Sequence, residues 1–350
     1  MVQVQGNPGE EVYVEIPWIK DLKGGEYVYT VSAKLNDDEI WAKKGFEIAF
    51  GQNSRIVEAE KQENLEKLSV VYGDVNIGVS YDNFKVMFSK TEGGIVSLIY
   101  DNKEFIIRTP KQTYWRASTD NDKGYRHEYT CGEWAYATMF QKCIDFEVKV
   151  SEDNTKANII CTYELPNAAK NLVKVDYLVT APGIIKVTIK FNGAKGLSEL
   201  PTLGMSFKLN KEFEVFNWYG NGPDENYIDR KEGAKLGVYS KLVKDNLTPY
   251  LVPQECGNYT DTRWIEVRNN KSEGLRFSYE QSPFEFSVLP YSVMELENAM
   301  HNEELPSVTY TYVNILSKQM GVGGDDSWGA PVLPEYCIPS DNDIEYSFII

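Results

Sequence analysis

The stretch 321–328, GVGGDDSW, brings three glycines, two carboxylates and one indole into eight residues. A hydrolase that works through two carboxylates holds them on either side of one bond, roughly 5–9 Å apart. Asp325 and Asp326 are sequence neighbours, and such side chains point to opposite faces of an extended chain. They suit a turn that accepts hydrogen bonds from local amides better than a catalytic pair. Trp328 either packs into the core or presents its flat face to a sugar or aryl group, and the residues alone leave both interpretations open.

Three other stretches gather polar and aromatic side chains that could face a sugar or hold a loop. YWRASTDNDKG offers Arg116, Asp120, Asn121 and Asp122. A paired Arg and Asp in this stretch could clamp sugar hydroxyls or fix loops, and the second is commoner. In TPYLVPQECGNYTDTRW, two prolines mark an extended run that carries Glu255. The third stretch, FNWYGNGPDENYIDRKEG at 216–233, favours a structural loop over a sugar-facing wall.

The sequence contains two histidines, His127 and His301. A pair of His301 and Glu255 could carry out acid–base chemistry on a sugar ring. The alternative, which the pattern favours, places His301 at the C-terminal end of a helix, where the helix dipole stabilises a cation. Neither metal-ligand spacing nor a Ser–His–Asp arrangement is present. GVGGDDSW also lacks the lysine and the following helix of a phosphate-binding loop.

The composition restricts the class of protein and the class of partner. The chain has 350 residues and a formal charge of −16, which argues against nucleic acid and anionic membranes as partners. No apolar run approaches the ~20 residues of a membrane span. The N-terminal sequence lacks the basic and apolar regions of a signal peptide. The 5 cysteines are odd in number and form no CxxC pair, so we expect a reducing, cytoplasmic location.

Alternating polar and apolar residues predict a small β module in residues 1–55, with strands at 10–18, 26–35 and 44–51. Three strands are fewer than the ~7 of a complete immunoglobulin-like sandwich. The module should therefore expose an unfinished edge or borrow strands from elsewhere. This indicates that the chain is a piece of something longer.

The rest of the chain predicts a linker followed by one large β domain. Residues 56–67 are highly charged and leave little to bury, as in a linker. From 68 to 350, closely spaced strand patterns with Gly, Asn and Asp turns favour antiparallel sandwiches over βαβ units. Two short helices are predicted, at 133–142 and at 292–301, and the second begins with the capping-box pattern SVME. The predicted fold class is all-β.

Four of these blocks occur in the same order in a known family. YWRASTDNDKG, WYGNGPDENYIDRK, TPYLVPQECGNYTDTRW and MGVGGDDSWG resemble the C-terminal small-chain domain of the large β-galactosidases of glycoside hydrolase family 2. The resemblance covers residues 68–350, and residues 1–55 resemble the second half of the preceding immunoglobulin-like domain. It implies a large antiparallel super-sandwich, similar in fold to galactose mutarotases, after a partial immunoglobulin-like module. Family small subunits begin near residue 68, so it also implies that Met1 is a fragment start.

The resemblance also assigns expected roles. In that family the two catalytic glutamates and the magnesium and sodium sites belong to a central barrel, which this chain lacks. It therefore implies no catalytic residue, metal or cofactor in this chain. It implies that Trp328 reaches the mouth of the barrel's active site and contacts the substrate on the aglycone side, while Asp325 and Asp326 brace its loop. Further residues that could face the sugar or brace loops are Arg116, Asp120, Glu255 and His301.

The expected function is the C-terminal part of a β-galactosidase that hydrolyses terminal β-D-galactosides such as lactose. The expected partners are the catalytic barrel domain or a separate large subunit, and the galactoside, within a homo- or hetero-oligomer. Alone, the chain is expected to be inactive. Two alternatives stay open. One is a non-catalytic carbohydrate-binding or assembly module with Tyr- and Trp-rich loops. The other is an aldose mutarotase that uses His301 and Glu255.

Overall fold

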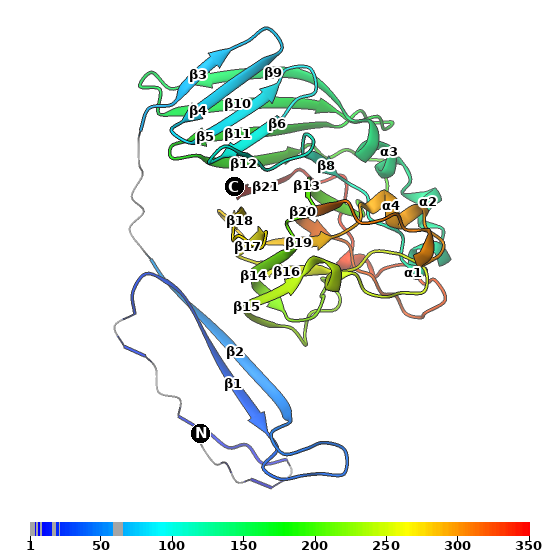
Figure 1. The fold of residues 1–350 in the computed structure, drawn as a ribbon. Helices are drawn as coiled ribbons and strands as arrows, with labels where there is room; N and C mark the ends of the chain where they lie inside the picture. Colours follow the sequence, from blue (N-terminus) through cyan, green and yellow to red (C-terminus); the bar gives the residue numbers. More distant parts are fainter. Residues whose placement is uncertain (1–3, 5, 8, 16–18, 21, 59–65) are drawn as a thin grey trace. The chain divides into compact units, whose positions relative to one another are not determined.

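The computed structural model describes residues 4, 6–7, 9–15, 19–20, 22–58 and 66–350 (Figure 1). The chain divides into two compact units, residues 1–63 and 64–350. Every strand pair among the described residues is antiparallel. The prediction of an all-β, antiparallel fold is confirmed.

The first unit contains one hairpin, β1 (Gly25–Lys34) and β2 (Glu47–Val57). These strands match two of the three predicted ones. The third prediction, at 10–18, is wrong for residues 10–15, which form no strand, and its last three residues lie outside the described part. β2 runs to Val57, two residues into the predicted linker, and residues 59–65 of that linker also lie outside the described residues. No described residue of this unit is buried, because two strands alone provide no second layer.

The second unit is built around a nine-stranded sheet with the order β15-β14-β17-β18-β21-β12-β11-β10-β9. The bounds of its strands, in chain order, are β9 (Lys142–Val150), β10 (Lys156–Glu164), β11 (Leu172–Thr180), β12 (Ile184–Phe191), β14 (Val215–Gly222), β15 (Lys235–Leu242), β17 (Trp264–Arg268), β18 (Gly274–Tyr279) and β21 (Ile344–Ile349).

Two five-stranded sheets accompany it, with the orders β16-β19-β20-β13-β8 and β3-β4-β5-β6-β7. The strands of the first are β8 (Lys111–Thr113), β13 (Thr202–Asn210), β16 (Asn258–Thr262), β19 (Phe284–Leu289) and β20 (Tyr310–Gln319). The strands of the second are β3 (Ser69–Tyr72), β4 (Asn76–Tyr81), β5 (Phe84–Ser89), β6 (Ile95–Tyr100) and β7 (Lys103–Glu104).

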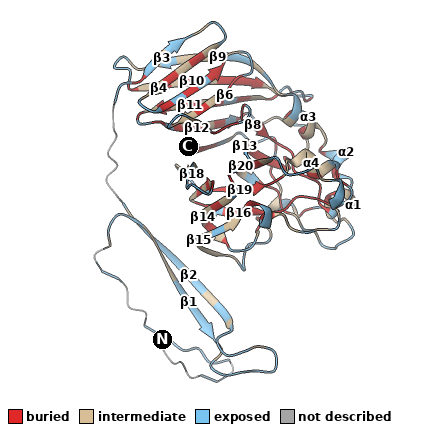
Figure 2. Cartoon of the chain, viewed as in Figure 1, coloured by how far each residue is buried: buried red, intermediate tan, exposed pale blue. Residues whose placement is uncertain are grey.

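The two smaller sheets cover different ends of the nine-stranded sheet, so the unit is a super-sandwich with one continuous core (Figure 2). Phe88 on β5 lies 5.3 Å from Tyr177 on β11, between ring centroids. At the other end, Phe207 on β13 lies 4.9 Å from Phe277 on β18. The strands alternate as a one-face core requires: β12, IIKVTIKF, buries every second residue.

Short helices lie among the loops of the second unit. Their bounds are α1 (Asp120–Gly124), α2 (His127–Thr130), α3 (Glu133–Phe140) and α4 (Val293–Asn298), with 3-10 turns η1 (Val243–Asn246), η2 (Asn302–Glu304) and η3 (Pro334–Tyr336). α3 and α4 match the two predicted helices. In α4 the capping box is present, since Ser292 Oγ accepts from the Glu295 amide and the Glu295 carboxylate accepts from the Ser292 amide. α4 ends at Asn298, so His301 does not end a helix, and that interpretation is wrong.

Trp218 on β14 lies at the centre of an aromatic cluster in the core. Its ring lies 4.4 Å from Tyr259 and 5.2 Å from Phe216, between centroids. Its indole N–H donates to the Asn221 carbonyl at 3.0 Å, so burial leaves no polar group of this side chain without a partner. The cluster fixes β14 against β16 and β19 of the opposing sheet.

Replacing Trp218 by alanine should lower the free energy of unfolding by about 3–5 kcal/mol, because it empties a fully packed site. Urea denaturation of the whole chain measures this loss. Trp328→Ala is the matched control, because the Trp328 side chain is 86% exposed and its loss should change stability by about 0.5 kcal/mol or less. Equal losses for the two variants would contradict the assignment of Trp218 to the core.

Candidate functional site

The glycine-rich loop that follows β20 begins on a carboxylate from another part of the chain. Asp229 Oδ2 accepts hydrogen bonds from the amides of Val322 and Gly323, each at 2.8 Å. A Cβ on Gly321 would lie 2.6 Å from the same oxygen. Only glycine at 321 therefore permits this contact, and the start of the loop is fixed to the 223–234 segment.

The far side of the loop is held by Asp326. Its Oδ1 accepts from the amides of Trp328 at 2.8 Å and Ala330 at 3.2 Å, and its carbonyl accepts from the Asn121 side chain at 3.1 Å. Next along the chain, Gly329 has a φ of +110°, and a Cβ there would lie 2.5 Å from the Cα of Gly124. Two glycine backbones thus pack directly against each other, which side chains at either position would prevent.

Two side chains of this loop point into solvent. Trp328 is 86% exposed, so the alternative that placed it in the core is wrong. Asp325 is exposed as well, and it has no hydrogen-bond or ion-pair partner among the described residues. Asp326 therefore stabilises the loop itself, whereas Asp325 remains accessible in the same loop as the exposed indole.

A fully buried ion pair lies beneath the loop. Arg116 donates to both carboxylate oxygens of Asp122, at 3.0 and 2.9 Å. Its remaining donors reach the carbonyls of Met320 at 2.5 Å and Gly321 at 2.8 Å. Burial acts to raise the pKa of Asp122, but the charge and hydrogen bonds of Arg116 hold that pKa below its ordinary value. Arg116 is thus a loop-bracing residue, and it does not face solvent.

His127 packs against this pair. Its ring stacks on Trp115, with centroids 5.0 Å apart and planes at 17°, and its Nδ1 lies 3.8 Å from Asp122 Oδ2. Burial lowers the pKa of His127 to about 4, so the ring is neutral near neutral pH. One local sequence signal could have pointed to Asp122. This signal is its spacing from Thr119, because the two residues form a capping box at the start of α1.

Glu255 forms the floor of a polar depression of about 170 Å³ beside the loop. Asp120, Gln254 and Arg230 are among its lining residues. Gln254 donates to Asp120 Oδ2 at 3.2 Å, and Tyr227 donates to Glu255 Oε1 at 3.3 Å. Burial raises the pKa of Glu255 to about 7. Of the predicted residues, Asp120 and Glu255 therefore line the same cavity, which could take a hydroxyl-bearing ligand group.

The predicted pair of His301 and Glu255 is not formed. The His301 side chain is 67% exposed, and its Nδ1 lies 3.0 Å from Glu304 Oε1. That contact raises the pKa of His301. Glu255 is buried among other partners, so the acid–base interpretation of this pair is wrong.

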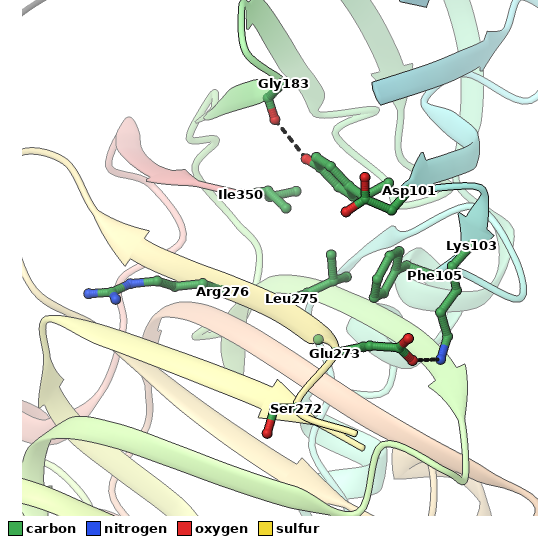
Figure 3. A pocket seen from close by; sticks show the side chains of 11 residues that line it. Asp101, Lys103, Phe105, Gly183, Ser272, Glu273, Leu275, Arg276 and Ile350 are labelled. Carbon is green, nitrogen blue, oxygen red and sulfur yellow. Dashed lines mark hydrogen bonds and ion pairs between the residues drawn. The ribbon is translucent and has the colours of Figure 1, made fainter. Parts of the chain in front are cut away.

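The larger cavity drawn in Figure 3 is lined by none of these residues. It measures about 520 Å³ and is bounded by the β6–β7 and β17–β18 hairpins. Its charged groups are largely occupied, since Lys103 bridges Glu273 at 2.7 Å and Glu212 at 2.9 Å. Tyr100 donates to the Gly183 carbonyl at 2.7 Å. The cavity offers no exposed aromatic platform.

The described residues contain no group of three or more His, Cys, Asp or Glu side chains that could hold a metal ion. No helix among them is long and apolar enough to cross a membrane.

Comparison with known proteins gives consistent matches. Residues 80–350 match the family described as "Beta galactosidase small chain", and residues 2–54 match "Beta-galactosidase, domain 4". The chain is 42% identical to a β-galactosidase of Halalkalibacterium halodurans over 98% of its own length and 34% of the relative. It is 34% identical to a β-galactosidase small subunit of Latilactobacillus sakei, over 81% of this chain and 98% of that one.

The chain spans about a third or less of the first curated relatives that it matches. Among solved structures, a galactose 1-epimerase from Lactobacillus acidophilus NCFM matches with a TM-score of 0.36 and 8% identity, over 81% of this chain and 97% of that one. A similarity of this degree carries no conclusion about activity.

Glu255→Gln should change how stability depends on pH. The wild-type carboxyl has a pKa of about 7 in the folded chain against an ordinary value of 4.5. The folded state therefore binds more protons between these values, and stability is lost as pH rises from about 4.5 to 7. Glutamine removes this contribution.

Urea denaturation of wild type and Glu255→Gln at a series of pH values tests this prediction. The quantity compared is the difference between their free energies of unfolding. The difference is needed because His127, with its lowered pKa, contributes a slope of opposite sign below about pH 6.5. As the pH rises from about 4.5 to 7, the free energy of unfolding of the variant should increase relative to that of wild type by a few kcal/mol. Parallel curves would show that Glu255 is charged in the fold. Glu285→Gln removes another buried glutamate whose pKa is raised to about 7, and it should show a gain of the same sign in the same pH window.

Proposed function

The chain belongs to the β-galactosidase small-chain family, and on this premise we propose that it is the C-terminal, non-catalytic part of a β-galactosidase of glycoside hydrolase family 2. The complete enzyme hydrolyses terminal β-D-galactosides such as lactose. The observation that carries the proposal is the braced loop that presents Trp328 to solvent. The match to a free-standing small subunit over nearly its whole length supports it.

The described residues support placing the chemistry outside this chain. Asp326 Oδ1 already accepts two amides, and Glu255 lies at a buried position with a raised pKa. The acid and the nucleophile are supplied by a barrel domain or by a separate large subunit. By the resemblance to the family, magnesium and sodium are bound by that partner as well.

Trp328 supplies binding energy in this scheme. An indole face stacks on the apolar faces of a sugar or an aryl aglycone. Binding of the ligand therefore removes this exposed apolar face from water. Asp325, which is exposed three residues before Trp328, can accept a hydrogen bond from a sugar hydroxyl. The two side chains together line the aglycone side of the active-site mouth.

The assembly is a homo- or hetero-oligomer that contains the barrel-bearing part. The described structure has five free cysteines, which supports a reducing compartment. The cytoplasm is therefore the proposed location.

Hydrolysis of an aryl β-galactoside tests the division of labour. The chain alone should be inactive, and mixing it with the barrel-bearing remainder of its enzyme should restore activity. The remainder alone is the control. Activity of the isolated chain would show that it holds its own acid and nucleophile and would overturn the proposal.

Trp328→Ala in the assembled enzyme should raise KM for an aryl galactoside by a factor that corresponds to about 1–3 kcal/mol, by analogy with bases stacked on aromatic side chains. Tyr129→Ala is the matched control, since Tyr129 is an aromatic side chain that is 81% exposed on α2. It should leave KM unchanged. An unchanged KM in both variants would remove Trp328 from the substrate site.

A further inference from the structure

Strand β9 forms one edge of the nine-stranded sheet and pairs with β10 through a bulge. Tyr163 faces Cys143 and Thr162 faces Asp145, so Ile144 has no partner in the register. An unpaired residue breaks the strict alternation of faces. As a result Ile144 is 48% exposed, while Cys143 turns inward and packs against the core.

The inward turn brings the Cys143 side chain close to the turn under which the Cys161 side chain of β10 also lies. The amide of Gly94 donates to Cys161 Sγ at 3.2 Å. A Cβ on the preceding residue, Gly93, would lie 2.8 Å from Cys143 Sγ. Two adjacent glycines of the β5–β6 turn thus touch one sulfur each, and both thiols lie under the same turn. The other three cysteines, Cys131, Cys256 and Cys337, lie elsewhere in the chain.

We propose that Cys143 and Cys161 form an oxidisable thiol pair, which a peroxide converts to a reversible disulfide between the edge strand β9 and its neighbour β10. The site is independent of galactoside binding. It makes the edge of the large sheet a place of covalent modification.

The reaction balances with hydrogen peroxide as the oxidant. The Cys143 thiolate attacks one peroxide oxygen, an S–O bond forms, the O–O bond breaks, and hydroxide leaves and takes up a proton to become water. The Cys161 sulfur then attacks the resulting sulfenic acid. The S–S bond forms, the S–O bond breaks, and the hydroxyl leaves as water with the proton of the Cys161 thiol. The two thiols lose two electrons in total, and the peroxide becomes two molecules of water.

The electrostatics support the order of these steps. The neighbouring Cys161 thiol lowers the pKa of Cys143 to about 7, and Cys143 in turn raises the pKa of Cys161. Cys143 also donates to the Asp145 carbonyl at 3.4 Å. The other titratable groups that face the pair are Tyr163, Tyr177 and Asp145, whose charge acts to raise the pKa of Cys143. A half-exposed thiol that ionises near neutrality is the attacking group, and the buried thiol is the resolving group.

The geometry also makes the disulfide easy to reduce. Diagonal neighbours in antiparallel strands have Cα atoms about 7–8 Å apart, whereas a disulfide needs about 4.4–6.8 Å. Closure must therefore draw the bulged part of β9 toward β10. Strained disulfides have more oxidising potentials than structural ones, so thiol reductants should reopen this one.

Alkylation of the unmodified chain tests the first step without any variant. Cys143 should react with iodoacetamide at about pH 7 at least roughly threefold faster than Cys337, because more of it is thiolate. Cys337 is the matched control, since it is also half-buried but its pKa is raised by burial. Equal rates for the two residues would overturn the proposal.

Hydrogen peroxide followed by peptide mapping tests the second step. Wild type should yield a linked peptide pair that contains Cys143 and Cys161, and dithiothreitol should remove it. Cys161→Ser should stop Cys143 at the sulfenic acid, which dimedone traps, whereas Cys337→Ser should behave as wild type. Random pairing among the five cysteines, or no pairing while Cys143 is oxidised further, would contradict the assignment.

Discussion

The buried ion pair of Arg116 and Asp122 is the constraint on which the candidate site depends. Both side chains are fully buried, and two such charges are tolerated only when their hydrogen bonds are complete. Here the guanidinium meets that condition by reaching a carboxylate and the carbonyls of Met320 and Gly321. Its position is therefore fixed on one side by α1 and on the other by the end of β20. Any shift of the loop's first residues would leave part of a buried cation without acceptors.

The rest of the loop extends this fixed base outward. Asp229 holds the next amides, Asp326 closes the turn before Trp328, and the contact of Gly124 with Gly329 sets the return of the chain. Behind them lies a super-sandwich whose aromatic core gives rigid support. A side chain that extends from a rigid base loses little entropy when it binds, and a site held in this way suits a contact made with a partner domain. The exposed indole is thus the outcome of several buried contacts.

The sequence could predict those features that depend on local pattern. The alternation of apolar residues predicted the β1–β2 hairpin and an antiparallel β domain after residue 68. The SVME pattern predicted the start of α4, and the glycines of GVGGDDSW predicted a tight loop. Features that depend on distant contacts could not be predicted. The strand expected at 10–18 lacks a described partner strand, and Asp122 could not be identified as the partner of Arg116 before the short helix α1 was known. His301 was misplaced because α4 ends three residues earlier than its pattern suggested. The bulge that turns Cys143 inward has no local signature.

A double-mutant cycle on KM of the assembled enzyme tests the central claim, that the braced loop acts through Trp328. The cycle combines Asp229→Ala, which removes the acceptor of two loop amides, with Trp328→Ala. Because a misplaced loop and a missing indole lose the same contact, the double variant should have nearly the KM of Trp328→Ala alone. Fully additive losses would contradict the account, since they would show that Asp229 and Trp328 contribute to substrate binding independently.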